Sequence, residues 1–397
     1  MQPSTLPNQL PAQLPVPDAS ALAHSQQLQK ILLQRIEAAG GWMGFDTYME
    51  TALYEPGLGY YSGGATKFGP AGDFVTAPEL SPLFGATLAR PIADWLRASA
   101  SQVLEFGAGS GALAAQLLNA LGSQDCAPEQ YFILELSGTL RARQQETLAR
   151  VAPQWAERVR WLDALPENFD GVMLGNEVLD AMPVRLFVKH EGLIRERGVA
   201  SHRGQCVFAD APADAALGAQ ITALETHLGG ALPDGYVSEV CPAASAFIAS
   251  VAACLQRGVV LLIDYGFPAR EYYHPQRTQG TLMCHYRHHA HGDPFLYPGL
   301  QDITAHVDFS ALAHAAHDAG LTLLGYTSQA RALINAGITE LAANLDRNDL
   351  ATFLPAARGL QTLMAESEMG ELFKMIAFGT GSTNFDTTLF NQGNRHL

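Results

Sequence analysis

Seven short apolar runs, separated by longer polar or helical stretches, constrain the fold of this chain more than any other feature. They lie at residues 103–106, 131–134, 159–162, 172–174, 259–263, 321–324 and 374–378. Short apolar runs that alternate with helical patterns are typical of βαβ units, whose parallel strands are buried on both faces of a sheet. We therefore predict an α/β fold with one doubly wound, mainly parallel sheet of seven strands.

Two gaps between these runs are too long for ordinary connections. About 80 residues separate the fourth and fifth runs, and about 55 separate the fifth and sixth, whereas connections in compact domains are far shorter. Alternating segments at 185–188, 193–198 and 205–208 predict a small antiparallel hairpin or meander in the first gap. The second gap is rich in Gly, Pro and His and shows little regular pattern. Both gaps follow strand ends where open α/β sheets bind ligands, so we expect a lid or substrate platform there.

These patterns divide the chain into six parts. We expect a disordered tail (1–25), an N-terminal helical and loop cover (26–84), a first core part (85–184), an inserted hairpin with helices (185–257), a second core part (258–380) with a lid insertion (267–308), and a C-terminal tail (381–397). The first 25 residues are rich in Pro, Gln, Ala and Ser and lack periodicity. Apolar residues at helical spacing from 25 to 39 predict a helix that ends at Gly40 and Gly41.

Charge and cysteine content exclude several classes of protein. The 397 residues carry a formal net charge of -15, which repels phosphate backbones and argues against broad nucleic-acid binding. Five scattered cysteines without Cys-x-x-Cys spacing argue against a disulfide framework or a zinc knuckle and indicate a reducing compartment. The longest apolar stretch, 247–267, is interrupted by Gln256, Arg257 and Asp264, so we expect no membrane span. The N-terminus does not resemble a signal peptide, and we expect a soluble cytoplasmic protein.

The strongest local signal is a strand that runs into a glycine-rich turn and then a helix, at residues 103–112. Gly107 permits the tight turn, Gly109 lets a ligand approach the backbone, and Gly111 permits close helix packing. In this context the pattern predicts a nucleotide-like cofactor at the turn, with Ala108 also in contact.

Two cofactors fit this turn. The Gly-x-Gly-x-x-Ala spacing of 107–112 satisfies a relaxed dinucleotide fingerprint, so NAD must be considered. Glu105, two residues before the first glycine, favours S-adenosylmethionine because an acid there can bind the amino group of that cofactor. Glu135 ends the second strand and could hold ribose hydroxyls of either cofactor, with Leu136 beside it in the same site.

The end of the third strand supplies a candidate adenine contact. Asp163 could accept a hydrogen bond from the adenine amino group, while Ala164 and Leu165 pack on the ring. Alternatively, Asp163 is only a turn residue.

The end of the fourth strand supplies the candidate catalytic residues. Asn176 and Glu177 fall where the strand meets the cofactor, and a carboxylate beside a methyl acceptor can orient an amine or guanidinium. Asp180 would share a face with Glu177 if a helical turn follows the strand. We predict that Glu177 and Asp180 are catalytic and that Asn176 and Glu177 contact the cofactor. Alternatively, Asn176 caps a helix whose acids are solvated.

Several longer motifs occur in a fixed order along the chain. They lie at residues 54–61, 72–79, 103–112, 175–184, 263–267, 302–309 and 369–374. In this combination the chain resembles the MidA-like family of class I S-adenosylmethionine-dependent methyltransferases. The mitochondrial members of that family are complex I assembly factors that methylate a protein arginine. The resemblance spans residues 45 to 379.

The resemblance implies a Rossmann-like sheet of seven strands with one reversed edge strand and S-adenosylmethionine at its carboxyl edge. It also places the segment 72–78 against the cofactor, which makes Gly72, Thr76 and Pro78 predicted contacts. The implied acceptor is an arginine of a protein substrate, such as a respiratory complex I subunit. Because an arginine is protonated at neutral pH, carboxylates are expected beside it. Glu55 and Glu79 are held in reserve for that role.

Other functions stay open at this point. The chain could be a non-catalytic assembly or docking protein that retains the cofactor fold, or, less favoured, an NAD-dependent oxidoreductase. It lacks the Gly-x-Ser-x-Gly elbow of hydrolases and the phosphate loop of NTPases. The oligomeric state is open, a homodimer included.

Two histidine-containing segments have more than one interpretation. The segment 284–291 holds several potential metal ligands, but methyl transfer needs no metal, and we favour a polar lid loop without a metal. His306 and Asp308 could line the acceptor pocket, where His306 would be catalytic, or could cap a helix that starts at Phe309.

Overall fold

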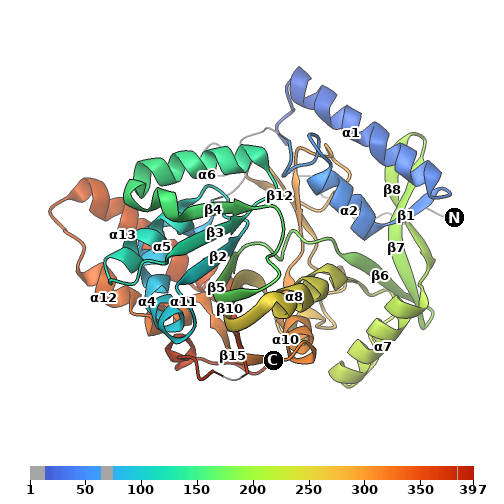
Figure 1. The fold of residues 1–397 in the computed structure, drawn as a ribbon. Coiled ribbons are helices and arrows are strands. Elements are labelled where there is room, and N and C mark those ends of the chain that lie inside the picture. Colours follow the sequence, from blue (N-terminus) through green and yellow to red (C-terminus); the bar gives the residue numbers. More distant parts are fainter. Residues whose placement is uncertain (1–13, 64–74, 382) are drawn as a thin grey trace.

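A computed structural model describes residues 14–63, 75–381 and 383–397. The chain forms a large α/β core, at the left of Figure 1, and a smaller β-rich part at the right, built from the N-terminal helices and the first insertion.

The core is organised around one large sheet. Its strands follow the order β15 (Leu321–Ser328), β16 (Phe373–Thr380), β10 (Leu255–Phe267), β5 (Phe169–Asn176), β2 (Gln102–Phe106), β3 (Gln130–Leu134) and β4 (Val159–Leu162). The short strand β14 (Val307–Asp308) also pairs in parallel with the end of β10. Each of the seven apolar runs lies in one strand of the main path. The runs in the central strands β2, β5, β10 and β16 are buried, whereas those in the edge strands β4 and β15 are partly exposed.

The position of the reversed strand corrects one expectation. Strand β16 runs antiparallel to both of its neighbours, β10 and β15, so it lies inside the sheet and not at its edge. All its residues except Thr380 are buried, and such a strand needs partners on both sides. The edge strand on this side is β15.

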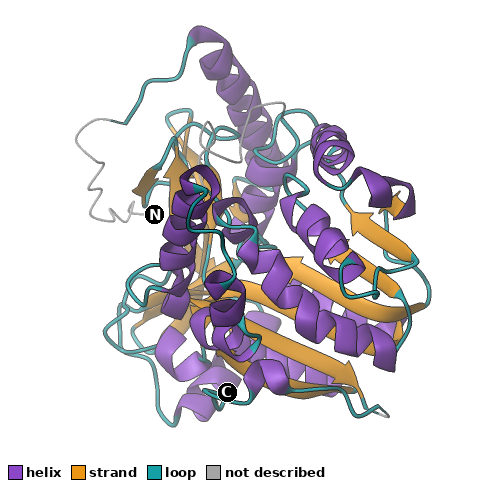
Figure 2. Ribbon diagram, turned by 90° about the vertical axis from the view of Figure 1, so that its left-hand side faces the viewer, coloured by secondary structure: helices purple, strands orange, loops and turns teal. Residues whose placement is uncertain are grey.

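Helices cover both faces of this sheet, as Figure 2 shows from the side. Alternate residues of β10 divide between two apolar clusters, with Leu261 in one cluster and Val260 and Leu262 in the other. One face is covered by α4 (Leu83–Ala98), α5 (Ala112–Gly122) and α11 (Gln329–Asn335), and the other by α8 (Pro242–Cys254) and α10 (Phe309–Asp318). Further helices of the core are α3 (Ala77–Leu80), α6 (Gly138–Val151), α12 (Ile338–Ala343), α13 (Leu350–Met364) and α14 (Met369–Leu372).

The first insertion forms a second, antiparallel sheet. Its order is β1 (Trp42–Gly44), β7 (Leu193–His202), β6 (Arg185–His190) and β9 (Val237–Val240), with β8 (Gln205–Pro212) paired to β7. Strands β6, β7 and β8 confirm the predicted meander, whereas β1 and β9 were not expected. The associated helices are α1 (Ala19–Ala38), α2 (Phe45–Tyr54) and α7 (Ala215–Leu228).

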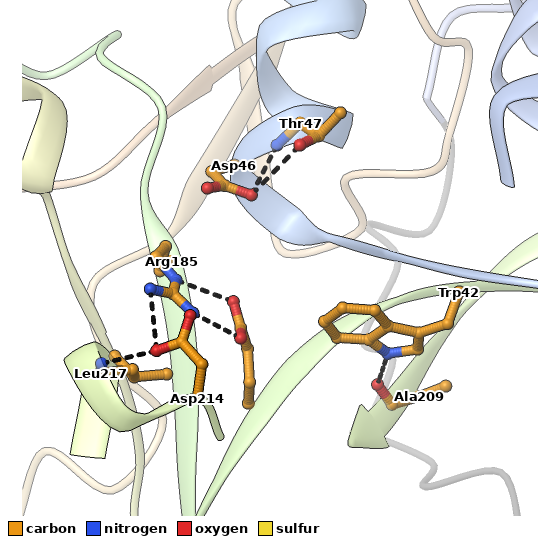
Figure 3. A network of polar contacts seen from close by, with 8 residues as sticks. Trp42, Asp46, Thr47, Arg185, Ala209, Asp214 and Leu217 are labelled. Carbon is orange, nitrogen blue, oxygen red and sulfur yellow. Dashed lines mark hydrogen bonds and ion pairs between the residues drawn. The ribbon is translucent and has the colours of Figure 1, made fainter. Parts of the chain in front are cut away.

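Polar side chains hold this second sheet to its helices (Figure 3). Arg185 donates to Glu196 on β7 (2.6 Å) and to Asp214 (2.8 Å), and Asp214 in turn caps α7 by accepting from the Leu217 backbone. The indole of Trp42 donates to the carbonyl of Ala209 at 2.8 Å and so links β1 to β8 across the intervening strand β7.

The second insertion contains more regular structure than the sequence indicates. It forms a three-stranded sheet from β12 (His289–His291), β11 (Met283–Tyr286) and β13 (Asp302–Thr304), preceded by α9 (Ala269–Tyr272). The His-rich segment is the β11–β12 hairpin, and its turn contains Arg287 and His288 at positive φ. Strands this short carry too few residues for a periodic pattern, which is why the sequence of this insertion shows little regularity. Within the described ranges, no three His, Cys, Asp or Glu side chains are grouped so that they could hold a metal.

The N-terminal boundary of the first helix differs from expectation. Helix α1 begins at Ala19, capped by Asp18, so residues 19–25, which we assigned to a disordered tail, are helical. At the C-terminus, Arg395 donates its backbone N–H to Tyr326 and forms two bonds of 2.6 and 2.8 Å with Glu371. These contacts fasten the C-terminal segment to the core. None of the described helices is long and apolar enough to cross a bilayer.

Candidate active site

The glycine-rich turn joins β2 to α5 as predicted. Gly107 and Gly109 adopt φ values of 56° and 52°, which residues with a Cβ rarely adopt. A Cβ on Gly107 would also lie 3.2 Å from Cγ1 of Val178. The Gly107 N–H donates to the Leu134 carbonyl at 3.0 Å, which fixes the turn next to the end of β3.

Glu105 lies on β2 directly before this turn. Its carboxylate is buried and accepts a hydrogen bond of 2.6 Å from the Tyr131 hydroxyl. Burial raises the pKa of Glu105 to about 7, with Tyr131 opposing the rise. A positive group at the turn would favour its ionised form, as the amino group of S-adenosylmethionine would.

Glu135 follows β3 and its carboxylate is held by two donors. Oε1 accepts from the Ser137 backbone at 2.9 Å, and Oε2 accepts from the Gln144 amide at 3.1 Å. Burial raises the pKa of Glu135. Leu136 is 76% exposed, so this loop presents an apolar surface that a flat ring could cover. The sequence analysis missed Gln144.

Asp163 and Ala164, at the end of β4, are exposed. Asp163 forms an ion pair of 2.5 Å with Arg141 on α6, which sequence reasoning did not anticipate. The adenine contact of this loop stays a prediction.

Thr76 and Pro78 belong to the start of α3. The Pro78 carbonyl accepts a hydrogen bond from Gln116 on α5 at 2.7 Å. Between them, the Ala77 backbone bonds to the carboxylate of Glu177, so this segment lies against the candidate catalytic acid. Gly72 lies outside the described residues.

The segment after β5 brings Asn176 and Glu177 together, though without the helical turn that we expected. Glu177 has a φ of 54°, which ends the strand in a left-handed conformation, and its N–H donates to the Ile263 carbonyl at 2.8 Å. The Asn176 amide donates to Glu177 Oε1 at 3.0 Å. Within the described part of the chain, the buried Oδ1 of Asn176 has no hydrogen-bond partner. Burial, and then the charge of Asp180, raise the pKa of Glu177 to about 8.

Asp180 is held from the end of β10. Its Oδ2 accepts a hydrogen bond of 2.5 Å from the Tyr265 hydroxyl. The buried Asp264 accepts from the Leu179 backbone (2.9 Å) and the Asp180 backbone (3.3 Å), which fixes the turn on which Asp180 lies. Burial raises the pKa of Asp180 to about 6, with the Tyr265 hydrogen bond opposing the rise.

Two tyrosines and an aspartate that we had not assigned to the site lie beside Asp180. The Tyr54 hydroxyl donates to the Ala181 carbonyl at 3.0 Å, and its ring stacks on Tyr61 with centroids 5.5 Å apart. The Tyr61 hydroxyl donates to Asp302 at 2.9 Å. The motifs 54–61 and 302–309 were the sequence signal for these residues, but nothing local indicated that they meet.

His306 lies in an aromatic setting, and Asp308 in a helix cap. The His306 ring stacks on Phe267 at 5.3 Å and meets Tyr265 edge-on at 5.1 Å. Burial lowers the pKa of His306 to about 4, so it is neutral at pH 7. Asp308 accepts from the Ser310 and Ala311 backbones and caps α10, in agreement with the capping alternative. A catalytic role for His306 stays a prediction.

The two acids held in reserve already have cationic neighbours. Glu55 forms an ion pair of 2.7 Å with Arg35, and Glu79 lies 3.7 Å from Arg143.

These residues fit an adenosyl cofactor with an amino-acid end. The glycines of the turn leave its backbone accessible, Glu135 offers a carboxylate, and Leu136 offers an apolar surface. The partnerless Oδ1 of Asn176, among the described residues, leaves an acceptor for a further donor. A buried polar atom of this kind is stabilised by a ligand that supplies the missing hydrogen bond.

Comparison with known proteins agrees with this fit. A family model for S-adenosyl-L-methionine-dependent methyltransferases matches residues 87–327. The mitochondrial protein arginine methyltransferase NDUFAF7 of Danio rerio is 28% identical, over 89% of this chain and 88% of the relative. The Mus musculus protein of the same name is 30% identical, over 83% of this chain and 79% of the relative.

Two solved structures are more similar to this chain than these mitochondrial relatives are. A Burkholderia thailandensis protein bound to S-adenosyl-homocysteine is 57% identical, with a TM-score of 0.92 over 96% of this chain and 99% of that one. A native crystal structure from the same organism is 56% identical, with a TM-score of 0.89 and the same coverage. The choice between NAD and S-adenosylmethionine is thereby decided. This chain belongs to the MidA-like family of S-adenosylmethionine-dependent methyltransferases, and S-adenosylmethionine is its cofactor.

Proposed function

We propose that this enzyme methylates an arginine side chain of another protein. The observation that carries the proposal is the pair of acids Glu177 and Asp180 at the carboxyl end of β5. Within the described ranges, neither carboxylate forms an ion pair with a Lys, Arg or His side chain. Asp180 is buried and Glu177 is partly buried. Acids that are shielded from water without a cation are costly, and a cationic substrate would relieve that cost.

The electrostatics of the pair favour a cation over a neutral acceptor. The pKa of Glu177 is raised to about 8 and that of Asp180 to about 6, chiefly by burial. A guanidinium stays charged at any accessible pH, and its approach would lower both pKa values and ionise the acids. Two carboxylates also match the several N–H groups of a guanidinium.

We assign separate tasks to the two acids. Asp180, held by Tyr265, fixes the orientation of the guanidinium, because its carboxylate cannot rotate without breaking that hydrogen bond. Glu177 attracts the positive charge of the guanidinium and accepts the proton that the guanidinium loses as its nitrogen is methylated. The guanidinium would lower the pKa of Glu177 from about 8 toward neutrality, and a base with a pKa near neutrality suits that task. When bound, the cofactor supplies a methyl group on positive sulfur, and the N–C bond forms as the S–C bond breaks.

The names of the relatives support the same acceptor. The Danio rerio and Mus musculus proteins are named protein arginine methyltransferases. By family resemblance we extend the proposal to a subunit of respiratory complex I as the protein substrate, and we propose a cytoplasmic location.

Labelled methyl transfer into proteins of a cell lysate, followed by mass-spectrometric mapping, tests the proposal. We expect methylated arginine, lost with Glu177→Gln and retained with Asp94→Asn, which removes an exposed acid of α4. Label on lysine or on a small molecule would contradict the arginine assignment. No label on any acceptor, with partner binding retained in Glu177→Gln, would support a docking protein instead.

A further inference from the structure

A buried glutamine on α6 connects three elements that meet at the cofactor edge of the sheet. Gln144 is fully buried, and its Nε2 donates to the Gly109 carbonyl and to Glu135 Oε2, both at 3.1 Å. Its Oε1 accepts from the Trp161 indole at 2.8 Å. The side chain therefore joins the glycine turn, the end of β3 and strand β4.

The partners of this amide permit only one orientation. The indole N–H of Trp161 can only donate, whereas the Gly109 carbonyl and an ionised Glu135 carboxylate can only accept. The amide oxygen must face Trp161, and its two hydrogens then serve the two acceptors. The reversed amide would place its oxygen against both acceptors and its NH₂ group against the indole N–H, at the cost of three buried hydrogen bonds.

We propose that Gln144 is a positioning residue for the cofactor, which holds the Glu135 carboxylate at a fixed place relative to the glycine turn. Glu135 is the group that we assign to the ribose hydroxyls. A carboxylate with fixed oxygens binds two hydroxyls without losing rotational freedom on binding. Gln144 thus acts on the ribose through Glu135, without touching the ligand.

The backbone around Gln144 is arranged for this contact. A Cβ on Gly111 would lie 3.1 Å from Cα of Gln144, so the glycine lets α6 approach the turn closely. One helical turn earlier, Arg141 donates to the carbonyls of Glu135 (2.6 Å) and Leu162 (2.8 Å). Helix α6 therefore fixes both the backbone and the side chain of Glu135.

A matched pair of variants separates this role from packing. Gln144→Met keeps the length and helix propensity of the side chain but removes its hydrogen bonds. Gln145 is the next residue of the same helix and is exposed, so Gln145→Met is the control for the substitution itself.

Calorimetry with two ligands supplies the readout. The ligands are S-adenosylhomocysteine and its analogue without the ribose 2′-hydroxyl. For the natural protein and for Gln145→Met, we expect the missing hydroxyl to weaken binding about tenfold. For Gln144→Met, we expect S-adenosylhomocysteine to bind about tenfold more weakly and the ratio between the ligands to fall to about two.

The ratio decides between positioning and packing. If Gln144 had only a structural role, its loss would weaken the binding of both ligands by the same factor. An unchanged ratio of about ten between the two dissociation constants in Gln144→Met would therefore overturn the proposal. If thermal melting shows that Gln144→Met is unfolded, Trp161→Phe takes its place, because it removes the donor that fixes the amide. A lower ratio in Trp161→Phe would support the proposal, and an unchanged one would refute it.

Discussion

The hydroxyl of Tyr265 donates a hydrogen bond of 2.5 Å to Oδ2 of Asp180, although the two residues are 85 positions apart in the chain. Tyr265 is itself held edge-on between the rings of His306 and Phe373, at 5.1 and 5.4 Å. The hydroxyl therefore has little freedom to leave Asp180, and the aspartate is fixed in turn.

This bond predicts the effect of Tyr265→Phe. The hydrogen bond lowers the pKa of Asp180, which lies at about 6 because burial outweighs it. Without the bond the pKa rises, so less Asp180 is ionised at pH 7 and turnover falls several-fold. We expect the acid limb of the turnover-against-pH profile to move to higher pH, with unchanged affinity for S-adenosylhomocysteine. A pH profile identical to that of the natural enzyme would refute the proposed role of Asp180 in the reaction.

Glu177→Gln should separate turnover from cofactor affinity. The amide keeps the shape of the side chain but cannot accept a proton or neutralise a guanidinium, so we expect turnover to fall by at least a hundredfold. Calorimetry should show nearly unchanged affinity for S-adenosylhomocysteine. Wild-type turnover in this variant would refute the assignment of Glu177.

The same variant should change stability with pH. The folded-state pKa of Glu177, about 8, is raised above its ordinary value of 4.5, so the folded protein binds more protons than the unfolded chain between these values. Ionisation of Glu177 therefore lowers stability as pH rises through that range. We expect Glu177→Gln to melt at a higher temperature than the natural protein at pH 9, and the difference to shrink toward pH 5. An equal difference at both pH values would contradict the raised pKa.

Gly109→Val should abolish cofactor binding while the chain stays folded. A branched side chain is strained at a φ of 52° and would fill the space beside the turn. Calorimetry should detect no S-adenosylhomocysteine binding, and circular dichroism should be unchanged. Gly218→Val is the control, because Gly218 lies in α7 and no atom of the described residues comes within 4 Å of a Cβ placed there. Retained binding in Gly109→Val would place the cofactor elsewhere.

Glu135→Ala should weaken cofactor binding rather than chemistry. Hydrogen bonds to a charged group contribute about 1.5–3 kcal/mol, so the dissociation constant should rise roughly ten- to a hundredfold. Turnover at saturating S-adenosylmethionine should stay close to that of the natural enzyme. Unchanged affinity would mean that another group holds the ribose.

Much of the core could be predicted because its strands are buried on both faces and appear as apolar runs. Strand β1 and the three short strands of the lid could not be predicted, because segments of three or four residues show no periodic pattern. The place of β16 inside the sheet depends on pairing with distant strands, which no local pattern records.

The residues of the candidate site also fall into those that the sequence predicts and those that it does not. Glu105, Glu135, Asn176 and Glu177 follow from the rule that ligands bind at strand ends, because each lies at or next to one. The contact of Tyr61 with Asp302 spans 241 positions, and the positive φ of Glu177 is invisible in its residue type. Gln144 looks like any helix residue until its three partners are known.

The place of β16 has a consequence for how the chain is made. Strands β10 and β15 precede β16 along the chain, yet β16 lies between them in the sheet. When synthesis has reached residue 328, β10 and β15 are therefore both present, but the strand that pairs with each of them is not. Until residues 373–380 leave the ribosome, two strand edges carry unpaired backbone groups that neighbouring chains could capture. The last strand therefore completes the sheet by pairing with both edges. A chain whose synthesis stops before Phe373 is expected to aggregate through these unpaired strand edges.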